Sequence, residues 1–192
     1  MYLYLIRHGQ SEANVRGEYC GWSQVALTEK GIADARRAGA LLKDISFDKV
    51  YASDLKRAMQ TCENALSGVP YETDPLLREL YTGSLEGLAV QKAHELYGEP
   101  HDLALKNSDF RAYGGETRQM QIDRLRTFLQ KMENFAEDEK VAVFCHAGTL
   151  FCMMELALDT PFSFDHLMID NGSVSVFRFS FGIWQLNKWN MI

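Results

Sequence analysis

The chain has 192 residues, of which 46% are hydrophobic and 24% charged, ordinary proportions that exclude a disordered or fibrous protein. Its formal net charge of -6 argues against a general nucleic-acid-binding surface, because affinity for a phosphate backbone needs clustered surplus cations. The length suits one hydrophobic core, so we predict a single domain over residues 1–192.

The sequence also indicates the cellular compartment. No apolar run reaches the roughly 18 residues of a membrane span, and the N-terminal apolar stretch meets Arg7 too early for a signal peptide. The four cysteines form no C-x-x-C pair, which disfavours a zinc ribbon or a thioredoxin motif. We expect a reduced, cytoplasmic protein with no membrane partner, and we leave the oligomeric state open, with a homodimer as one option.

Strand and helix signals alternate along the chain. Apolar or alternating runs predict strands at residues 2–6, 50–52, 141–145, 173–179 and 183–189. Helical spacing and caps at Thr28 and Ser53 predict helices at residues 28–42, 53–66, 89–97, 116–135 and 150–158. This alternation predicts an α/β fold, a three-layer α/β/α sandwich around a mostly parallel central sheet.

One region departs from this regularity. Between residues 72 and 115, helical spacing is interrupted by Gly83, Gly87, Gly98 and Pro100, and only residues 89–97 indicate a helix. We therefore predict an irregular, cap-like insertion at about residues 80–115.

Charged and polar residues follow three of the predicted strands. Arg7 and His8 end the first, Ser53 follows the second with Arg57 one helical turn later, and His146 follows the run at 141–145. Ligands of open α/β sheets bind beyond the carboxyl ends of the strands, so these residues should meet in one pocket. Guanidinium groups and helix N-termini match phosphate oxygens, which indicates phosphoryl chemistry.

A series of short motifs supports this interpretation. They are R-H-G at 7–9, L-T-E-K-G at 27–31, S-D-L-K-R at 53–57, L-R-E-L at 77–80, E-G at 86–87, G-G-E-T at 114–117 and the late His146. In this order, over nearly the whole chain, the set resembles the histidine phosphatase superfamily, also called the phosphoglycerate mutase-like family, and its small phosphatase branch in particular.

The resemblance implies a role for each motif residue. His8 becomes phosphorylated, and Glu79 protonates the leaving oxygen before activating water against phospho-His8. The phosphoryl oxygens are held by Arg7, Asn14, Arg57 and His146. No metal and no other cofactor is implied, so we expect a metal-independent phosphohydrolase of the histidine acid phosphatase type, acting on a small phosphorylated metabolite.

Two alternatives within the family stay open. A phosphoglycerate mutase uses the same phosphohistidine. Only 35 residues separate Glu79 from Gly115 in this chain, whereas the resemblance implies a longer chain with extra segments for a mutase. The second alternative is a regulatory protein that binds phosphate but does not hydrolyse a substrate. The departures from the family's usual residues, at Gln24, Leu85, Thr117 and Ala147, remove no catalytic group.

Two other enzyme classes are weaker. A thiol nucleophile at Cys145 needs His146 beside it, yet neighbouring strand residues point to opposite faces. A divalent metal between His8, His146, Asp54 and Glu79 would be repelled by the two arginines. The leaving group itself is not specified by the sequence, because Tyr19, Trp22, Lys106 and Arg111 lie in variable regions and are expected to be loop or surface residues.

Overall fold

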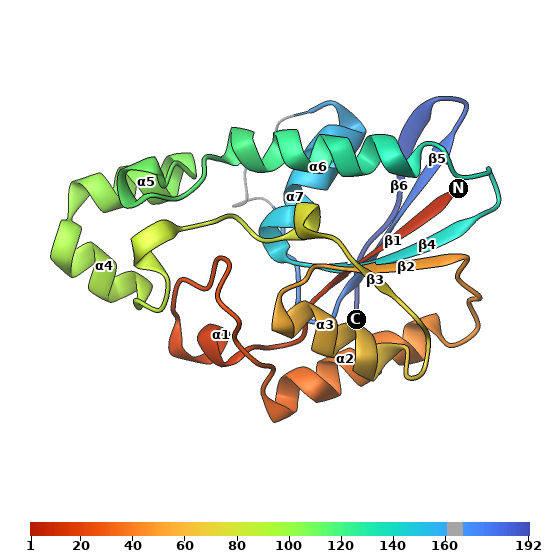
Figure 1. Ribbon diagram of the computed structural model, residues 1–192, viewed down its shortest axis with the longest axis horizontal. Coiled ribbons are helices and arrows are strands. Elements are labelled where there is room, and N and C mark those ends of the chain that lie inside the picture. Colours follow the sequence, from red (N-terminus) through yellow and green to blue (C-terminus); the bar gives the residue numbers. More distant parts are fainter. Residues whose placement is uncertain (161–166) are drawn as a thin grey trace.

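A six-stranded sheet forms the centre of the protein in the computed structural model, which describes residues 1–160 and 167–192 (Figure 1). The strands are β1 (Tyr2–Arg7), β2 (Lys49–Ala52), β3 (Glu72–Thr73), β4 (Lys140–Cys145), β5 (Val174–Ser180) and β6 (Ile183–Met191). Their order in the sheet is β3-β2-β4-β1-β5-β6. The first four strands run parallel to one another. Strand β5 is antiparallel to β1, and β6 is antiparallel to β5. The predicted α/β fold with a mostly parallel sheet is confirmed.

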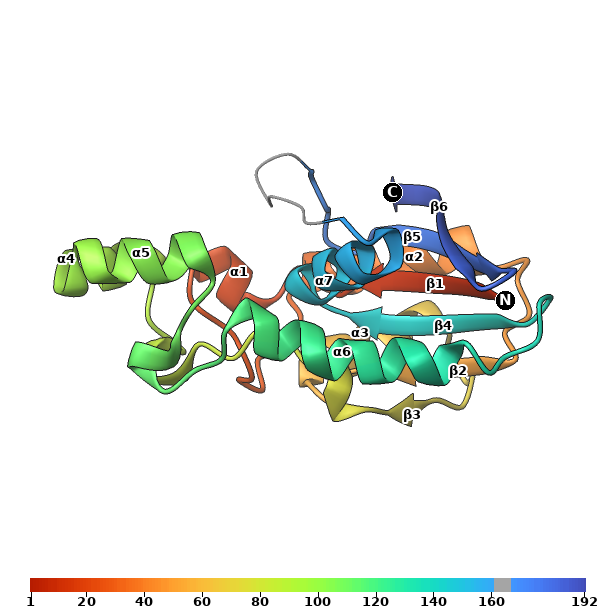
Figure 2. The same ribbon diagram turned by 90° about the horizontal axis from the view of Figure 1, so that it is seen from above.

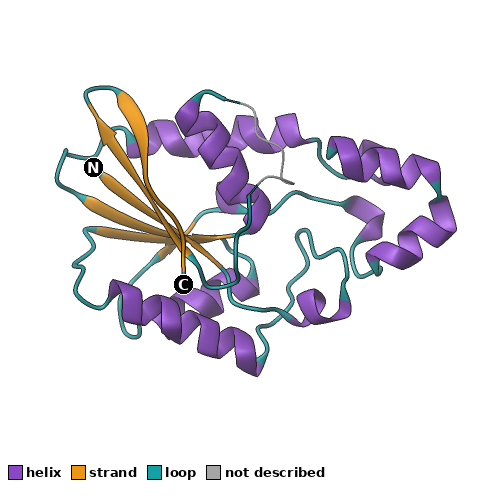
Figure 3. Cartoon of the chain, turned by 180° about the vertical axis from the view of Figure 1, so that it is seen from behind, coloured by secondary structure: helices purple, strands orange, loops and turns teal. Residues whose placement is uncertain are grey.

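Helices cover both faces of this sheet (Figures 1 and 3). Helices α2 (Glu29–Leu42) and α3 (Lys56–Ala65) cover one face, and α6 (Arg118–Met132) and α7 (Ala147–Leu158) cover the other. The other helices of the described residues are α1 (Glu12–Arg16), α4 (Val90–Tyr97) and α5 (Glu99–Asn107). The apolar run of β4 explains the three layers, because its side chains alternate between faces. Val141 and Val143 pack with α6 and α7, whereas Ala142 and Phe144 pack with α2 and α3.

The cap is more helical than the sequence predicted. Helices α4 and α5 lie beyond the carboxyl ends of the strands (Figure 2) and share a small apolar cluster with Tyr19 and Phe110. The prediction missed α5 because Gly98 and Pro100 were interpreted as breakers. Gly98 instead turns the chain between the helices with a φ of 58°, and Pro100 lies in the first turn of α5, where its missing N–H costs nothing.

Two helix starts also differ from the prediction. Helix α3 begins at Lys56 with Leu55 at the N-cap position, so the predicted cap at Ser53 was wrong. Helix α7 begins at Ala147, directly after His146, three residues earlier than predicted. Both shifts leave the residues at the strand ends extended, and their side chains reach the carboxyl edge of the sheet. The two-residue strand β3 was too short to be detected from the sequence.

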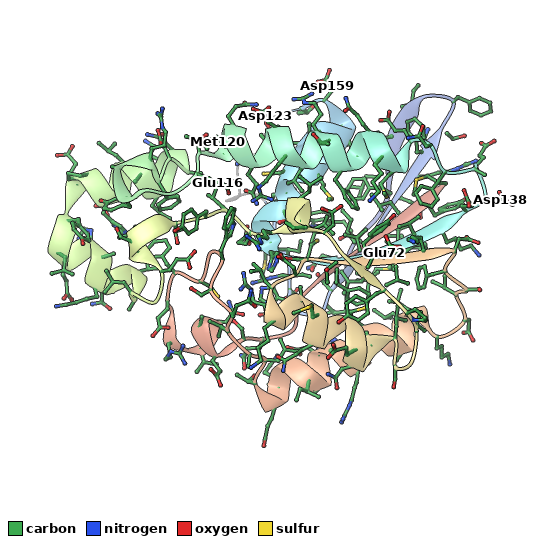
Figure 4. The ribbon with its side chains drawn as sticks, viewed as in Figure 1. Glu72, Glu116, Met120, Asp123, Asp138 and Asp159 are labelled. Carbon is green, nitrogen blue, oxygen red and sulfur yellow. The ribbon has the colours of Figure 1, made fainter. Side chains whose placement is uncertain are left out.

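One ion-pair cluster fixes the base of the cap. The Glu116 carboxylate, labelled in Figure 4 where the cap joins the body, accepts hydrogen bonds from the Tyr81 amide at 3.0 Å and from Arg124 Nε and Nη2 at 3.1 Å. Arg124 also donates to the carbonyls of Leu76 and Arg78 at 2.7 Å. The segment before the cap is thereby held against α6.

The packing of α6 on the sheet gives a stability prediction. Phe128 is fully buried and meets the Tyr51 ring edge-on, with ring centroids 5.5 Å apart. Phe128→Ala should lower the free energy of unfolding by about 3–5 kcal/mol, because it leaves a cavity in the core. Urea denaturation measures this, with Arg126→Ala on the exposed face of α6 as the control, expected within about 0.5 kcal/mol of the parent. Equal losses would mean that this core contact is not formed.

Candidate active site

The carboxyl ends of β1, β2 and β4 meet at one cavity of about 940 Å³. Its lining includes five of the residues singled out from the sequence, namely Arg7, His8, Asn14, Arg57 and Glu79. The sixth, His146, is fully buried, and its ring centroid lies 5.2 Å from that of His8. The strand register explains this pairing, because Arg7 of β1 lies opposite Cys145 of β4, so the next residue of each strand is a histidine.

His8 is held in one tautomer. Its Nδ1 lies 2.7 Å from the Gly9 carbonyl, and since a carbonyl oxygen only accepts, Nδ1 carries the hydrogen. Nε2 therefore bears the lone pair, and Arg57 Nε lies 3.3 Å from it. Burial, followed by the charges of Arg57 and Arg7, holds the pKa of His8 well below its usual value of 6.5. The ring is thus an uncharged imidazole with an available nucleophilic nitrogen.

Arg57 is fixed from the opposite side. Its side chain is buried, and Nη1 and Nη2 donate to the carbonyls of Ser23 and Gly21 at 3.0 and 2.8 Å. Glu86 holds this loop by accepting from the Trp22 amide at 2.5 Å and the Ser23 hydroxyl at 2.6 Å. A Cβ on Gly21 would lie 2.1 Å from Glu86 Oε1, so a side chain at this position would displace the Glu86 carboxylate.

His146 is oriented through Ser53. The hydroxyl of Ser53 lies 2.9 Å from His146 Nε2 and accepts from the Leu55 amide at 3.4 Å. When the Ser53 hydroxyl donates its hydrogen to Nε2, the imidazole hydrogen of His146 lies on Nδ1. His146 Nδ1 and Arg7 Nε are both buried, and neither has a hydrogen-bond partner among the described residues. Buried donors are normally paired, so these two are suited to an anion bound in the cavity.

Asn14 contributes a neutral donor. Its Oδ1 accepts from the Ser11 amide at 3.0 Å as part of the capping box of α1. This contact assigns the carbonyl end of the side chain, which leaves the NH₂ group of this cavity-lining residue as the donor.

Glu79 faces the same cavity from the segment before the cap. Its Oε1 accepts from the Leu80 amide at 2.9 Å and from Gln121 Nε2 at 3.3 Å, and its Oε2 accepts from the Gly148 amide at 3.0 Å. A Cβ on Gly148 would lie 2.2 Å from Glu79 Oε1. The Glu79 carbonyl is also fixed, by Trp22 Nε1 at 2.8 Å and Arg124 Nη2 at 2.9 Å. A carboxylate able to exchange a proton thus lines the same cavity as the His8 nucleophile.

Comparison with known proteins identifies the family. Residues 3–192 match the model of the histidine phosphatase superfamily (branch 1). The chain belongs to the histidine phosphatase superfamily.

Several relatives bear this out. Over 197 residues, 99% of this chain and 96% of the relative, the chain is 31% identical to the adenosylcobalamin/alpha-ribazole phosphatase of Salmonella typhimurium. Over 158 residues, 77% of each chain, it is 37% identical to a 2,3-bisphosphoglycerate-dependent phosphoglycerate mutase of Azorhizobium caulinodans. It is also similar to the structure of the alpha-ribazole phosphatase from Shigella flexneri, with a TM-score of 0.88 and 28% identity over 99% of this chain and 96% of that one.

The two rival sites are not formed. Cys145 points into the core beside Val143, and burial raises the pKa of its thiol, whereas a thiol nucleophile needs the opposite shift. Asp54 pairs with Arg78, with Nε and Oδ1 2.7 Å apart. The described residues therefore do not bring His8, His146, Asp54 and Glu79 within metal-ligating reach of one another.

The four residues that the sequence left without a role divide into two groups. Tyr19 and Lys106 line the cavity, and Trp22 stacks on Tyr81 while holding the Glu79 carbonyl. Arg111 is exposed and pairs with Asp109, as expected of a surface residue. The cavity residues of the cap were missed because α5, which carries Lys106, was not predicted.

The sequence also missed supporting residues. Ser53 was expected at the pocket, but as a helix cap and not as the partner of His146. Glu86 was recognised only as part of a motif without a role, and Gln121 gave no signal, because their partners lie far away in the sequence. A polar residue on the apolar face of a predicted helix was the available hint for Gln121, which is buried in α6.

The buried neutral histidines predict a pH-dependent stability. The folded-state pKa values of His8 and His146 are both depressed, so each contributes stability that is present above the unfolded value of about 6.5 and is lost as pH falls toward the depressed value. The free energy of unfolding should therefore fall as the pH drops below about 6.5. Urea denaturation at several pH values between about 7 and 5.5 measures it. His8→Asn should remove the part of the pH-dependent loss of stability that His8 contributes. An unchanged pH dependence of the free energy of unfolding in that variant would contradict a neutral, buried His8.

Proposed function

We propose that this member of the histidine phosphatase superfamily hydrolyses small phosphomonoesters through a phosphorylated His8. One observation carries the proposal: the lone pair of His8 Nε2 is set by the Gly9 carbonyl and lies beside the buried Arg57 guanidinium. An uncharged imidazole next to fixed cations is arranged to attack an electrophile that carries negative charge. A phosphoryl group is such an electrophile.

The first half-reaction forms a nitrogen–phosphorus bond. The phosphoryl oxygens accept from Arg7 Nε, His146 Nδ1 and the Asn14 amide, while His8 Nε2 attacks phosphorus in line with the ester oxygen. The phosphorus–oxygen bond breaks, and Glu79 gives its proton to the leaving alkoxide. The Nε–H of Arg57, directed at Nε2 before attack, then meets a phosphoryl oxygen.

The second half-reaction reverses the role of Glu79. Its carboxylate takes a proton from water, the water oxygen bonds to phosphorus, and the nitrogen–phosphorus bond breaks to restore neutral His8. Phosphoryl transfer demands mainly alignment and compensation of charge on the oxygens. Arg7 and Arg57 supply both from buried positions, so the chemistry needs no metal ion.

A phosphoglycerate mutase is the second candidate, favoured by the identity to the Azorhizobium mutase over 77% of the chain. We favour hydrolysis because the Salmonella phosphatase matches over 99% of the chain and because the insertion after Glu79 is short. Incubation with 3-phosphoglycerate separates the two: hydrolysis yields inorganic phosphate and glycerate, whereas a mutase yields 2-phosphoglycerate. A regulator without turnover is disfavoured, because His8 and Glu79 both line the cavity.

The remaining predictions concern the cellular location of the protein and its binding partners. Within residues 1–160 and 167–192, no helix has the length and apolar character required to cross a bilayer. We propose a cytoplasmic enzyme that acts on small molecules rather than nucleic acid, consistent with the net charge of -6. A homodimer stays a prediction, which the mass of the protein in solution checks.

Glu79→Gln tests the proton donor. The amide keeps the size of the side chain and an acceptor for the Gly148 amide, so phosphate affinity should stay within about threefold of the parent while turnover of alkyl esters falls by roughly 10² to 10⁴. An aryl phosphate, whose leaving group needs little protonation, should lose less in the phosphorylation step. Burst kinetics in which both substrates slow equally would show that Glu79 is not the acid.

The phosphohistidine itself can be trapped. A phosphoramidate survives alkali and is labile in acid, so quenching turnover of a labelled phosphomonoester without acid should leave about one phosphoryl group per chain, on the peptide that contains His8. His8→Ala should remove both label and activity. Two in-line displacements predict net retention at a chiral phosphate, and inversion would mean direct attack by water and end the proposal.

A further inference from the structure

The cap carries a second cluster of titratable side chains, which the chemistry at His8 does not use. His94 lies in the last turn of α4, and His101 and Asp102 lie in the first turn of α5. The Nδ1 atoms of His94 and His101 lie 2.7 and 3.1 Å from the same atom, Asp102 Oδ1. Three potential ligand atoms, one per residue, lie within 4.8 Å of one another.

The second nitrogen of His101 is already held. His101 is 1% exposed, and its Nε2 lies 2.8 Å from the Tyr19 hydroxyl. Burial raises the pKa of Tyr19 to about 12, so the hydroxyl stays a neutral phenol that can accept a hydrogen bond. Histidines that bind metals commonly donate their other ring N–H to an oxygen, which fixes the ring and its tautomer. Tyr19 supplies that oxygen.

A hydrogen-bonded ion pair is the simpler interpretation of the cluster. Asp102 at the start of α5 and His94 at the end of α4 both suit the helix dipoles, and the two histidines lower the pKa of Asp102. The same arrangement presents two imidazole nitrogens and one carboxylate oxygen to a cation, and one of these imidazoles is buried and held on its other nitrogen by Tyr19. The distances also fit an ion, because ligands about 2.0–2.1 Å from a tetrahedral centre lie about 3.3 Å apart.

We infer that His94, His101 and Asp102 form a zinc-type divalent metal site on the cap. Two imidazole nitrogens and one carboxylate oxygen are a ligand set that suits Zn²⁺, with water at the fourth position. The two contacts, at 2.7 and 3.1 Å, would have to lengthen by about 0.6 and 0.2 Å to reach the ligand separation of about 3.3 Å. His94 can allow the larger change because 59% of its side chain is exposed. The ion would join α4 to α5 across the turn at Gly98.

The site is connected to the cavity through Tyr19. When metal occupies Nδ1 of His101, the ring hydrogen lies on Nε2 and is donated to the Tyr19 oxygen. The hydroxyl hydrogen of Tyr19 is then free for another acceptor, and Tyr19 lines the cavity. Metal binding on the cap therefore changes a hydrogen-bond donor in the wall of the active-site cavity.

Calorimetric titration of the full, chelator-treated chain with Zn²⁺ tests this inference, with Co²⁺ absorption as a second probe of a four-coordinate site. We expect one ion per chain. His94→Gln should weaken binding by more than the roughly 10- to 100-fold typical of losing a supporting contact. Glu95→Gln, at the next residue of α4 and paired only with Lys92 among the described contacts, is the matched control and should bind like the parent.

Tyr19→Phe isolates the supporting contact, since it keeps the ring but removes the hydroxyl. It should weaken Zn²⁺ binding by roughly 10- to 100-fold while circular dichroism shows an unchanged fold. Absence of stoichiometric binding would overturn the inference. So would binding that is unchanged by His94→Gln, and if such binding were lost in His8→Ala the ion would belong to the catalytic cavity instead. Neither result would bear on the phosphohistidine mechanism.

Discussion

The contact between the buried guanidinium of Arg57 and the imidazole of His8 is the interaction on which the site depends. A charge without water requires compensation, and Arg57 obtains it from the carbonyls of Gly21 and Ser23, which makes the conformation of that loop part of the catalytic apparatus. Together with burial, the same charge lowers the pKa of His8, so in the proposed mechanism one buried cation both meets a phosphoryl oxygen and keeps His8 uncharged. Glu86 acts indirectly. Its carboxylate holds the loop whose carbonyls bind Arg57.

The sheet supplies the alignment that this chemistry requires. Parallel pairing of β1 with β4 sets the two histidines side by side, and parallel pairing of β2 with β4 brings Ser53 under His146. These positions belong to the rigid core, whereas Glu79 comes from an irregular segment fixed by Arg124, Trp22 and the start of α7. The positions of His8 and His146 are thus set by strand register, and the position of Glu79 is set by side-chain contacts that tie the cap to the body.

This division also explains what could be predicted from the sequence. Apolar runs such as 141–145 specify a buried strand unambiguously, so the fold and the residues at the strand ends, His8 and His146, followed from pattern and motif order. Ser53 was misjudged because the same hydroxyl chemistry serves a helix cap and a histidine partner, and only the tertiary structure decides between them. Helix α5 was missed because Gly98 and Pro100 break a helix in its interior but are tolerated at its start. The clamps on Glu79 involve residues distant in the chain, which no local pattern encodes.

The contact between Gly148 and Glu79 has a consequence for how this sequence can drift. Ala147, directly after His146, carries a side chain at the start of α7. A single methyl carbon added at position 148 would lie 2.2 Å from the Glu79 carboxylate oxygen. Position 148 is therefore closed to every side chain while Glu79 keeps its place, and a substitution there has to be accompanied by a movement of Glu79.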